Sequence, residues 1–292
     1  MALIEDLKKI IKEKKYSNSF VAKALNISPA TLHLWLNNKY TGHVDKINEA
    51  VAKFIEIEHL REDNIQIKFI KTSIVKHIFE IAFTCHVENE IGVCYGDAGL
   101  GKTFAVKNFA MMNPGVILIE ADLGYSPKVL FSELHKKLGF DGTGTVHEMF
   151  LNIVEKLKYS GRLIIIDEAE HLPYKSLELV RRIYDKANIG ILLLGMKRLI
   201  SNLKGKNGQY AQLYSRVGIV TELTKLTSND EEAIIHSLVP KFKLPIEVVS
   251  GVSKGNTRIL TKLLVRAIRV AQINSSEINE DILAVSMRKT LL

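Results

Sequence analysis

The sequence is short of the features that mark several classes of protein. It has only two cysteines in 292 residues, Cys85 and Cys94, and neither lies in a CxxC pair or a cysteine–histidine cluster. A structural zinc site is therefore not expected, and two buried, reduced thiols are the simpler interpretation. No apolar run approaches the roughly 20 residues needed to cross a bilayer. Two acids, Glu5 and Asp6, interrupt the first residues, so we expect no signal peptide, no membrane partner and a cytoplasmic protein.

Low-complexity tracts and internal repeats are also absent, and the composition is that of a globular protein. Hydrophobic residues make up 47% of the chain and charged residues 25%. Lys and Arg total 40 against 32 Asp and Glu, so the formal net charge is +8. Most of the excess lies between Lys241 and Arg269, where seven basic residues accompany one acid, whereas residues 1–63 carry ten basic and nine acidic residues. This balance permits a polyanionic partner such as nucleic acid but does not require one.

Hydrophobic periodicity divides the chain into an all-helical start, an alternating middle and an all-helical end. Residues 1–62 are apolar at helical spacing. The middle alternates helices with five short apolar strands, at 91–95, 116–120, 163–166, 189–194 and 217–223. Such alternation predicts an α/β fold with a parallel sheet and helices on both faces. We therefore expect a small all-α domain at 1–62, an α/β core at 63–226 and a helical lid at 227–292.

Residues 96–103, Gly-Asp-Ala-Gly-Leu-Gly-Lys-Thr, match the phosphate-loop pattern G-x-x-x-x-G-K-[ST] between an expected strand and an expected helix. The glycines let backbone N–H groups converge on phosphates, and the start of the helix adds a positive field. We expect Lys102 to reach the β- and γ-phosphates of ATP and Thr103 to place its hydroxyl on Mg²⁺. The alternative is a glycine-rich turn without a ligand. The expected nucleotide contacts are Gly96, Asp97, Ala98, Gly99, Leu100, Gly101, Lys102 and Thr103.

Two acids, Asp167 and Glu168, end the apolar strand that begins at Leu163. Paired carboxylates at the end of a buried strand cost desolvation unless a cation lies nearby, and a site for Mg²⁺ and ATP supplies that cation. Asp167 is expected to hold the magnesium through water, and Glu168 to polarise the attacking water. The alternative is a pair of acids that caps a helix on a loop.

Taken together, the phosphate loop, the two acids and the helical end of the chain resemble the AAA+ ATPases. The resemblance implies a P-loop NTPase with the sheet order 5-1-4-3-2, in which an arginine from a neighbouring subunit completes each site. Arg216, just before the last expected strand, matches the position of that arginine; a surface arginine is the alternative. Arg258, which opens a helix of the lid, resembles the family's second sensor of the γ-phosphate. Its alternatives are a contact to DNA phosphate or a plain surface charge.

The first sensor is where the chain departs from that family. The family usually has a polar residue at the end of the fourth strand, whereas this strand ends Leu-Gly-Met-Lys at residues 194–197. We therefore expect hydrolysis that is slow or depends on a partner, with Lys197 as a candidate substitute.

The order and size of the parts are more specific than the phosphate loop itself. A small helix-turn-helix domain followed by an AAA+ ATPase, over nearly the whole length, resembles the target-selecting ATPases of DNA transposition, the B proteins of Mu-like phages and transposons. This resemblance implies ATP-dependent binding to double-stranded DNA without strong sequence preference and assembly of a homo-oligomer as a helical filament or ring. It also implies recruitment of a transposase, and an ATPase stimulated by DNA, oligomerisation or that transposase.

Residues 21–36 have the pattern of a helix-turn-helix. Asn26 suits the left-handed residue of the turn, Ser28 suits the cap of the second helix, and Pro29 suits its first position. The second helix of such a motif enters the major groove by its N-terminal residues. The expected DNA contacts are Ser28, Thr31, His33 and, on phosphate, Lys39. The alternative is a helical domain for protein contacts, since this region has a local charge of only +1.

Basic residues of the ATPase region are further candidates for contact with DNA. They are Lys128 after the second strand, Arg181 and Arg182 on the helix after the two acids, and Lys204 and Lys206 in a polar loop. Each of them, taken singly, is also explained as a solvated surface residue. A second function fits the same parts, namely an AAA+ regulatory switch whose helix-turn-helix reads one operator sequence.

Overall fold

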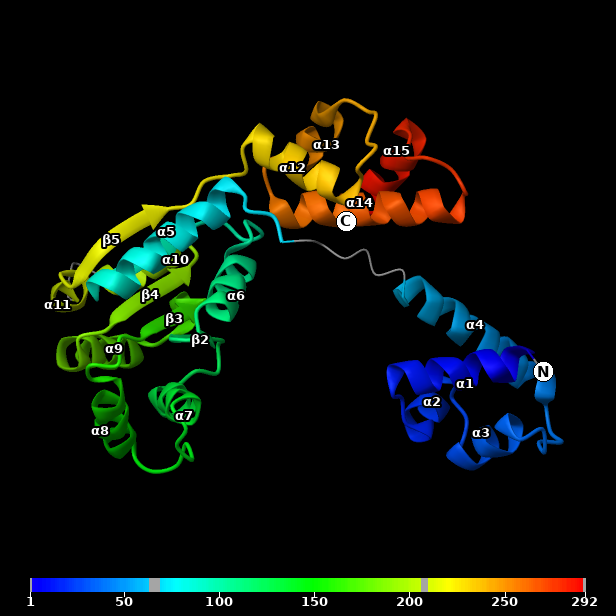
Figure 1. Ribbon diagram of the computed structural model, residues 1–292, viewed down its shortest axis with the longest axis horizontal. Helices are drawn as coiled ribbons and strands as arrows, with labels where there is room; N and C mark the ends of the chain where they lie inside the picture. Colours follow the sequence, from blue (N-terminus) through cyan, green and yellow to red (C-terminus); the bar gives the residue numbers. More distant parts are fainter. Residues whose placement is uncertain (1, 63–68, 206–209, 291–292) are drawn as a thin grey trace. The chain divides into compact units, whose positions relative to one another are not determined.

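Two separate units make up the chain in the computed structural model, Met1–Gln66 and Ile67–Leu292 (Figure 1). The structure describes residues 2–62, 69–205 and 210–290. Within these ranges no helix is both long and apolar enough to cross a membrane.

The N-terminal unit packs its helices around a small apolar core. Its helices are α1 (Ala2–Lys14), α2 (Asn18–Ala24), α3 (Pro29–Leu36) and α4 (Val44–Glu62). Apolar side chains at helical spacing meet in one cluster that includes Leu7, Val21, Leu32 and Val51, each 0% exposed. Trp35 belongs to this core, and its indole Nε1 donates a hydrogen bond to Asn48 Oδ1 at 3.0 Å.

The turn between α2 and α3 has the chemistry that its residues predict. Asn26 has φ 55, in the left-handed region that asparagine tolerates. Ser28 caps α3, because its side chain accepts from the backbone N–H of Thr31 at 3.0 Å, and Pro29 is the first residue of the helix. The apolar pattern of residues 32–35 predicts that Leu34 packs with Leu32 and Trp35, but Leu34 is 42% exposed and lies outside the core.

A five-stranded parallel sheet forms the centre of the second unit. Its strands are β1 (Ile91–Tyr95), β2 (Val116–Glu120), β3 (Leu163–Asp167), β4 (Gly190–Gly195) and β5 (Val217–Glu222). The order across the sheet is β2-β3-β4-β1-β5, which confirms the order implied by the AAA+ resemblance. All residues of β3 and β4 are buried, as expected of central strands covered on both faces.

Helices cover both faces of this sheet (Figure 1). Helices α5 (Ser73–Glu88) and α6 (Lys102–Met112) pack on one face. The other face is covered by α7 (Pro127–Lys137), α8 (Val146–Leu157), α9 (Tyr174–Ala187), α10 (Arg198–Lys204) and α11 (Ala211–Tyr214). Alternate residues of β3 enter the two cores: Leu163 and Ile165 face α5 and α6, and Ile164 and Ile166 face the other layer. The short helices α10 and α11 were not expected from the sequence.

Helices alone form the end of the chain, as expected of a lid. They are α12 (Ser228–Leu238), α13 (Ile246–Ser253), α14 (Thr257–Ile273) and α15 (Glu280–Arg288). Thr227 and Asp230 form a capping box at the start of α12. Asp230 also accepts hydrogen bonds from the backbone N–H of Ser73, at 2.7 Å, and from its hydroxyl, at 2.5 Å. The first turn of the lid is thereby joined to the first turn of α5.

The two thiols are predicted to be unreactive toward alkylating reagents in the folded protein. Cys85 and Cys94 are both unpaired and 0% exposed, and burial raises the pKa of each from 9.0 to about 12. This rise lowers the thiolate fraction at pH 8 by about 1000-fold, so iodoacetamide should modify neither residue until the chain is denatured. Rapid labelling at pH 8 in native buffer, detected by mass spectrometry, would contradict this burial. Because the folded-state pKa is raised, the associated stability is complete below about pH 9 and is lost as the pH rises toward 12.

Candidate nucleotide-binding site

A pocket of about 710 Å³ lies where the phosphate loop, the ends of β3 and β4 and the lid helix α14 meet. Its lining includes Lys102, Thr103, Asp167, Glu168 and Arg258, all of them site residues predicted from the sequence. The carboxyl ends of parallel strands meet at one edge of a sheet, which is where ligands of open α/β folds bind. The structure therefore brings the phosphate loop, the two acids and the lid arginine into one cavity.

Lys102 is held at the edge of this pocket by the loop that precedes it. Its Nζ donates hydrogen bonds to the carbonyl oxygens of Gly96, at 2.7 Å, and Asp97, at 2.8 Å. Burial lowers the pKa of Lys102, while the charge of Asp167 acts in the opposite direction. An ammonium group held by the loop itself is well placed to exchange these carbonyls for phosphate oxygens.

Thr103 and Asp167 form a direct pair at the floor of the pocket. The Thr103 hydroxyl donates to Asp167 Oδ2 at 2.5 Å, and Asp167 is 1% exposed. Burial raises the pKa of the Asp167 carboxyl, although the hydrogen bonds from Thr103 and from the backbone N–H of Glu168 oppose that rise. These hard oxygens suit Mg²⁺, which takes one or two protein ligands and completes its shell with phosphate and water. In the described ranges no cluster of three or more His, Cys, Asp or Glu is arranged to hold a metal unaided.

Glu168 leaves the strand in an unusual backbone conformation, with φ 52. Its side chain is 58% exposed, and His171 Nε2 lies 3.6 Å from its Oε2. The other ring nitrogen of His171, Nδ1, lies 3.4 Å from Nη2 of Arg198. Glu168 and His171 both line the pocket, and His171 is a lining residue that the sequence did not single out.

Helix α14 of the lid begins directly on the phosphate loop. The Asn256 side-chain amide donates to the carbonyl of Ala98 at 2.9 Å, and the backbone N–H of Arg258 donates to the carbonyl of Gly99 at 3.0 Å. Thr257 Oγ1 donates to Leu100 O at 3.3 Å. Three consecutive residues at the start of the lid helix therefore donate to three carbonyls of the loop.

Gly99 has to be a glycine for this contact to form. Its φ is 85, in the left-handed region, and a Cβ there would lie 2.4 Å from Asn256 Oδ1. Because the loop carbonyls are bonded to the lid, movement of the lid must either break these hydrogen bonds or displace the loop that would hold the phosphates. Asn256 and Thr257 are site residues that sequence reasoning missed.

Asn256→Asp should weaken ATP binding by about tenfold, because one hydrogen bond to the phosphate loop is lost and a negative charge is added nearby. The aspartate keeps the helix cap, in which the Asn256 side chain accepts from the N–H of Ile259. The matched control is Asn279→Asp, since Asn279 caps α15 in the same way by accepting from Ile282. Titration with a fluorescent ATP analogue measures both variants, and equal affinities would show that this lid contact does not support the site.

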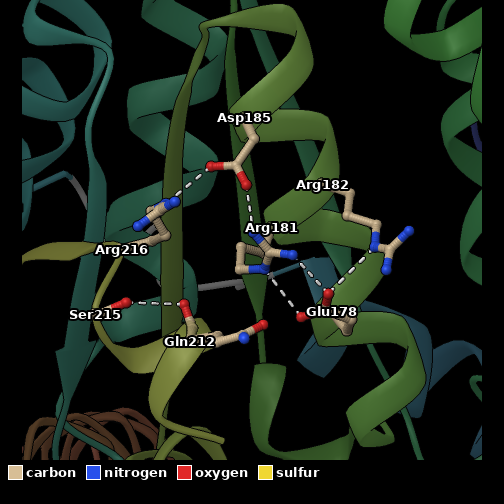
Figure 2. A network of polar contacts seen from close by, with 7 residues as sticks. All are labelled: Glu178, Arg181, Arg182, Asp185, Gln212, Ser215 and Arg216. Atoms are coloured by element: carbon tan, nitrogen blue, oxygen red, sulfur yellow. Dashed lines mark hydrogen bonds and ion pairs between the residues drawn. The ribbon is translucent and has the colours of Figure 1, made fainter.

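Arg216 lies away from the pocket of its own chain, just before the first residue of β5. Figure 2 shows how it is held: Arg216 Nε donates to Asp185 Oδ1 at 3.0 Å, and Asp185 Oδ2 accepts from Arg181 Nη1. Arg181 in turn donates from Nε to Glu178 Oε2 at 2.9 Å. Within residues 69–205 and 210–290, the two terminal nitrogens of Arg216 make no such bond.

The first-sensor position carries no polar side chain in the structure either. Strand β4 ends at Gly195, and the pocket is lined there by Gly195 and Met196. Lys197, the candidate substitute, is exposed and does not line the pocket.

Comparisons with known proteins agree with both units of the chain. Residues 86–203 match an AAA domain, and residues 6–50 match a Cro/C1-type HTH DNA-binding domain. The Mu-like prophage FluMu DNA transposition protein B of Haemophilus influenzae is 28% identical over 276 residues, which is 90% of this chain and 95% of that protein. The ATP-dependent target DNA activator B of Escherichia phage Mu is 26% identical over 290 residues, or 97% of this chain and 93% of the relative. The chain resembles the B proteins of Mu-like phages.

Solved structures support the fold of the second unit. The ORC2 protein of Aeropyrum pernix superposes with a TM-score of 0.58 at 16% identity, over 76% of this chain and 68% of that one. Domain III of the replication initiation protein DnaA of Thermotoga maritima gives a TM-score of 0.51 at 14% identity, over 77% of this chain and 95% of that one. Together with the sheet order and the match to an AAA domain, these similarities identify an AAA+ fold, and the match of residues 6–50 identifies a preceding helix-turn-helix domain.

The candidate DNA contacts of the chain differ in the exposure of their side chains and in the hydrogen bonds that these make. Ser28, His33 and Lys39 are exposed and Thr31 is half-buried, although the hydroxyls of Ser28 and Thr31 lie 2.8 Å apart and bind each other. In the ATPase unit Lys128 is exposed at the start of α7, and the Arg182 side chain is 58% exposed.

Two of the other basic candidates differ from expectation. Arg181 is only 11% exposed and is bonded to Glu178 and Asp185, so it is a poor candidate for DNA. Lys204 ends α10 rather than lying in a loop, and its Nζ is 4.9 Å from the ring centre of Tyr214. Lys206 lies outside the described residues.

Proposed function

We propose that the chain is an ATP-dependent DNA-binding ATPase of DNA transposition, which assembles on target DNA and recruits or stimulates a transposase. One observation supports this proposal above all. In a single chain, a helix-turn-helix unit is followed by a second unit whose phosphate loop and lid line a pocket. The relatives named transposition protein B and target DNA activator B align with at least 90% of its length. Fold alone would not support this role, since AAA+ domains serve many functions.

In the proposed reaction each pocket residue has a chemical task. The phosphate loop would bind the phosphates through its N–H groups, and Lys102 and Arg258 would neutralise their charge. Thr103 and Asp167 would hold Mg²⁺, which when bound offsets the charge of the phosphates. Glu168, exposed toward the pocket, would accept the proton of the attacking water.

The position of Arg216 supports assembly. Arg216 does not line the pocket of its own chain, and within the described residues its one side-chain hydrogen bond runs from Nε to Asp185, which suits action on a nucleotide held by another copy of the chain. We therefore propose that Arg216 completes the site of its neighbour in the oligomer. Hydrolysis would then depend on assembly, as in ATPases whose arginine finger comes from a second subunit.

Binding to DNA would also depend on assembly. A local charge of only +1 over residues 1–63 supplies little phosphate attraction from one N-terminal unit. Many linked copies add their weak contacts, so an ATP-assembled oligomer can bind duplex that a single copy does not hold. Lys39, Lys128, Arg182 and Lys204 are the proposed phosphate contacts, and Lys206 remains a proposed contact from its position in the sequence.

Electron microscopy of the protein with long duplex DNA tests the proposed assembly. We expect filaments or rings on the duplex with ATP and isolated molecules with ADP. Isolated molecules in both nucleotides would contradict assembly, and the strand-transfer reaction of a transposase without any stimulation by the ATP form would contradict the role in transposition.

A regulatory switch is the second candidate, favoured by the match of residues 6–50 to a Cro/C1-type HTH DNA-binding domain. The N-terminal part of α3 presents Ser28, Thr31 and His33, side chains that can reach base edges in a major groove. Selection of bound sequences from a random library separates the two functions. One enriched operator would favour the switch, and an unenriched pool would favour target DNA binding.

A further inference from the structure

An attacking water needs two hydrogen-bond acceptors. Its lone pair must face the γ-phosphorus, so both O–H groups point away from the phosphate and have to be held in place. Glu168 supplies one acceptor in the proposed function. The end of β4 supplies none, because Gly195 has no side chain and Met196 follows it.

Glu170 occupies the space above Gly195. It lies in the short 3-10 helix η1 (Ala169–His171) and is only 6% exposed. A Cβ on Gly195 would lie 2.2 Å from Glu170 Oε2, so the carboxylate fills the space that a larger residue at this position would need. Glu170 also lines the nucleotide pocket.

One carboxylate oxygen of Glu170 has no partner. In the described part of the chain, three buried side-chain oxygens lack a hydrogen bond: Glu170 Oε2, Ser176 Oγ and Ser250 Oγ. Of these residues only Glu170 lines the pocket. Buried carboxylate oxygens are rarely left unpaired, and such an atom at a pocket points to a ligand that donates to it.

We propose that Glu170 is the second acceptor for the attacking water, in place of the polar side chain that β4 lacks. This role rests on the proposed ATPase function. The water oxygen bonds to the γ-phosphorus while the bond to the β,γ-bridging oxygen breaks and its electron pair leaves with ADP. One water proton passes to Glu168, and the other O–H donates to Glu170 Oε2 and stays on the phosphate.

The charges around the pocket allow an ionised carboxylate at this place. The lining holds four cations, Lys102, Lys107, Arg258 and Lys262, of which Lys107 is paired with Glu120 at 2.8 Å. The other three match in number the carboxylates of Asp167, Glu168 and Glu170. A carboxylate beside the γ-phosphate is therefore compensated within the same cavity.

Glu170→Gln tests the proposal, because it keeps the size of the side chain and removes its charge. We expect kcat to fall by about 100-fold while the Kd for ATP changes less than about twofold. The affinity for ADP with aluminium fluoride, which mimics the transferring phosphoryl group, should fall with kcat. Glu170→Asp keeps the charge on a shorter chain and should retain more activity than the glutamine variant.

Two further variants serve as the negative and the positive control. Glu155→Gln changes an exposed residue of α8 and should behave as wild type. Glu168→Gln should lose turnover and retain ATP, as expected of the proposed general base. Thermal unfolding of each variant reports whether the fold is intact.

The possible outcomes distinguish a failure of the role proposed for Glu170 from a failure of the ATPase function on which that role rests. Normal kcat in Glu170→Gln, with turnover lost in Glu168→Gln, would overturn the role of Glu170 and leave the ATPase intact. An equal loss of affinity for ATP, ADP and the aluminium fluoride complex would make Glu170 a structural counter-charge and would also overturn it. No hydrolysis by wild type under any condition, with DNA and assembled protein included, would overturn the ATPase itself.

Discussion

Lys102→Ala should lower the affinity for ATP by at least about 100-fold and remove hydrolysis, because charge-assisted hydrogen bonds to phosphate contribute about 3 kcal/mol together. Lys102 Nζ is held 2.7 Å from the carbonyl of Gly96 and stands in the pocket beside Thr103 and Asp167. In the alanine variant no cation of the phosphate loop remains to face the β- and γ-phosphates. Isothermal titration with ATP measures the change directly.

Lys137→Ala is the control for this loss of charge. Lys137 ends α7, where its Nζ lies 3.7 Å from Glu133, and it does not line the pocket. It should bind ATP as wild type does. Wild-type affinity in Lys102→Ala would mean that the phosphates bind elsewhere, and the nucleotide site proposed here would be wrong.

Arg216→Ala should leave ATP binding by the single chain unchanged and lower assembly-stimulated turnover by about 1000-fold, the usual weight of an arginine supplied in trans. Asp185→Asn should have a smaller effect in the same direction. It removes the charge that holds Arg216 Nε at 3.0 Å but leaves the guanidinium present. Steady-state hydrolysis with saturating duplex DNA measures turnover, and Arg288→Ala, an exposed arginine of α15, is the control.

Mixing two inactive variants separates a neighbour's arginine from one that acts in its own chain. Subunits with Arg216→Ala keep an intact phosphate loop, and subunits with Lys102→Ala keep Arg216. A mixture should recover part of the turnover, since some sites combine Lys102 of one copy with Arg216 of the next. No recovery would contradict action in trans, and normal turnover by Arg216→Ala alone would place the stimulating arginine elsewhere.

Local chemistry made much of the fold predictable. The phosphate loop, the apolar strand before Asp167, and the Asn26–Ser28 turn are each specified by residues close in sequence, and the structure has the expected strand or cap at each place. The resemblance to AAA+ ATPases, rather than periodicity, supplied the order of the strands. Short helices such as α10 were missed because seven residues give little periodic signal.

Contacts between distant residues were not predictable in this way. Asn256 and Ala98 are 158 residues apart, and no local pattern relates a lid asparagine to a loop carbonyl. Arg181 is a different case, because Glu178 and Asp185 lie three residues before it and four residues after it on α9, a helical spacing that the sequence itself contains. The role proposed for Glu170 depends on its contact with Gly195, which ends strand β4 and is not close to Glu170 in sequence.

Fluorescence anisotropy of a labelled random-sequence duplex, titrated with the protein in ATP and then in ADP, measures whether the nucleotide controls binding to DNA. We expect tight, cooperative binding with ATP and a loss of affinity with ADP, and Lys102→Ala should resemble the ADP state in both nucleotides. Equal binding in ATP and ADP, or no binding in either, would contradict an ATPase pocket that controls assembly on DNA.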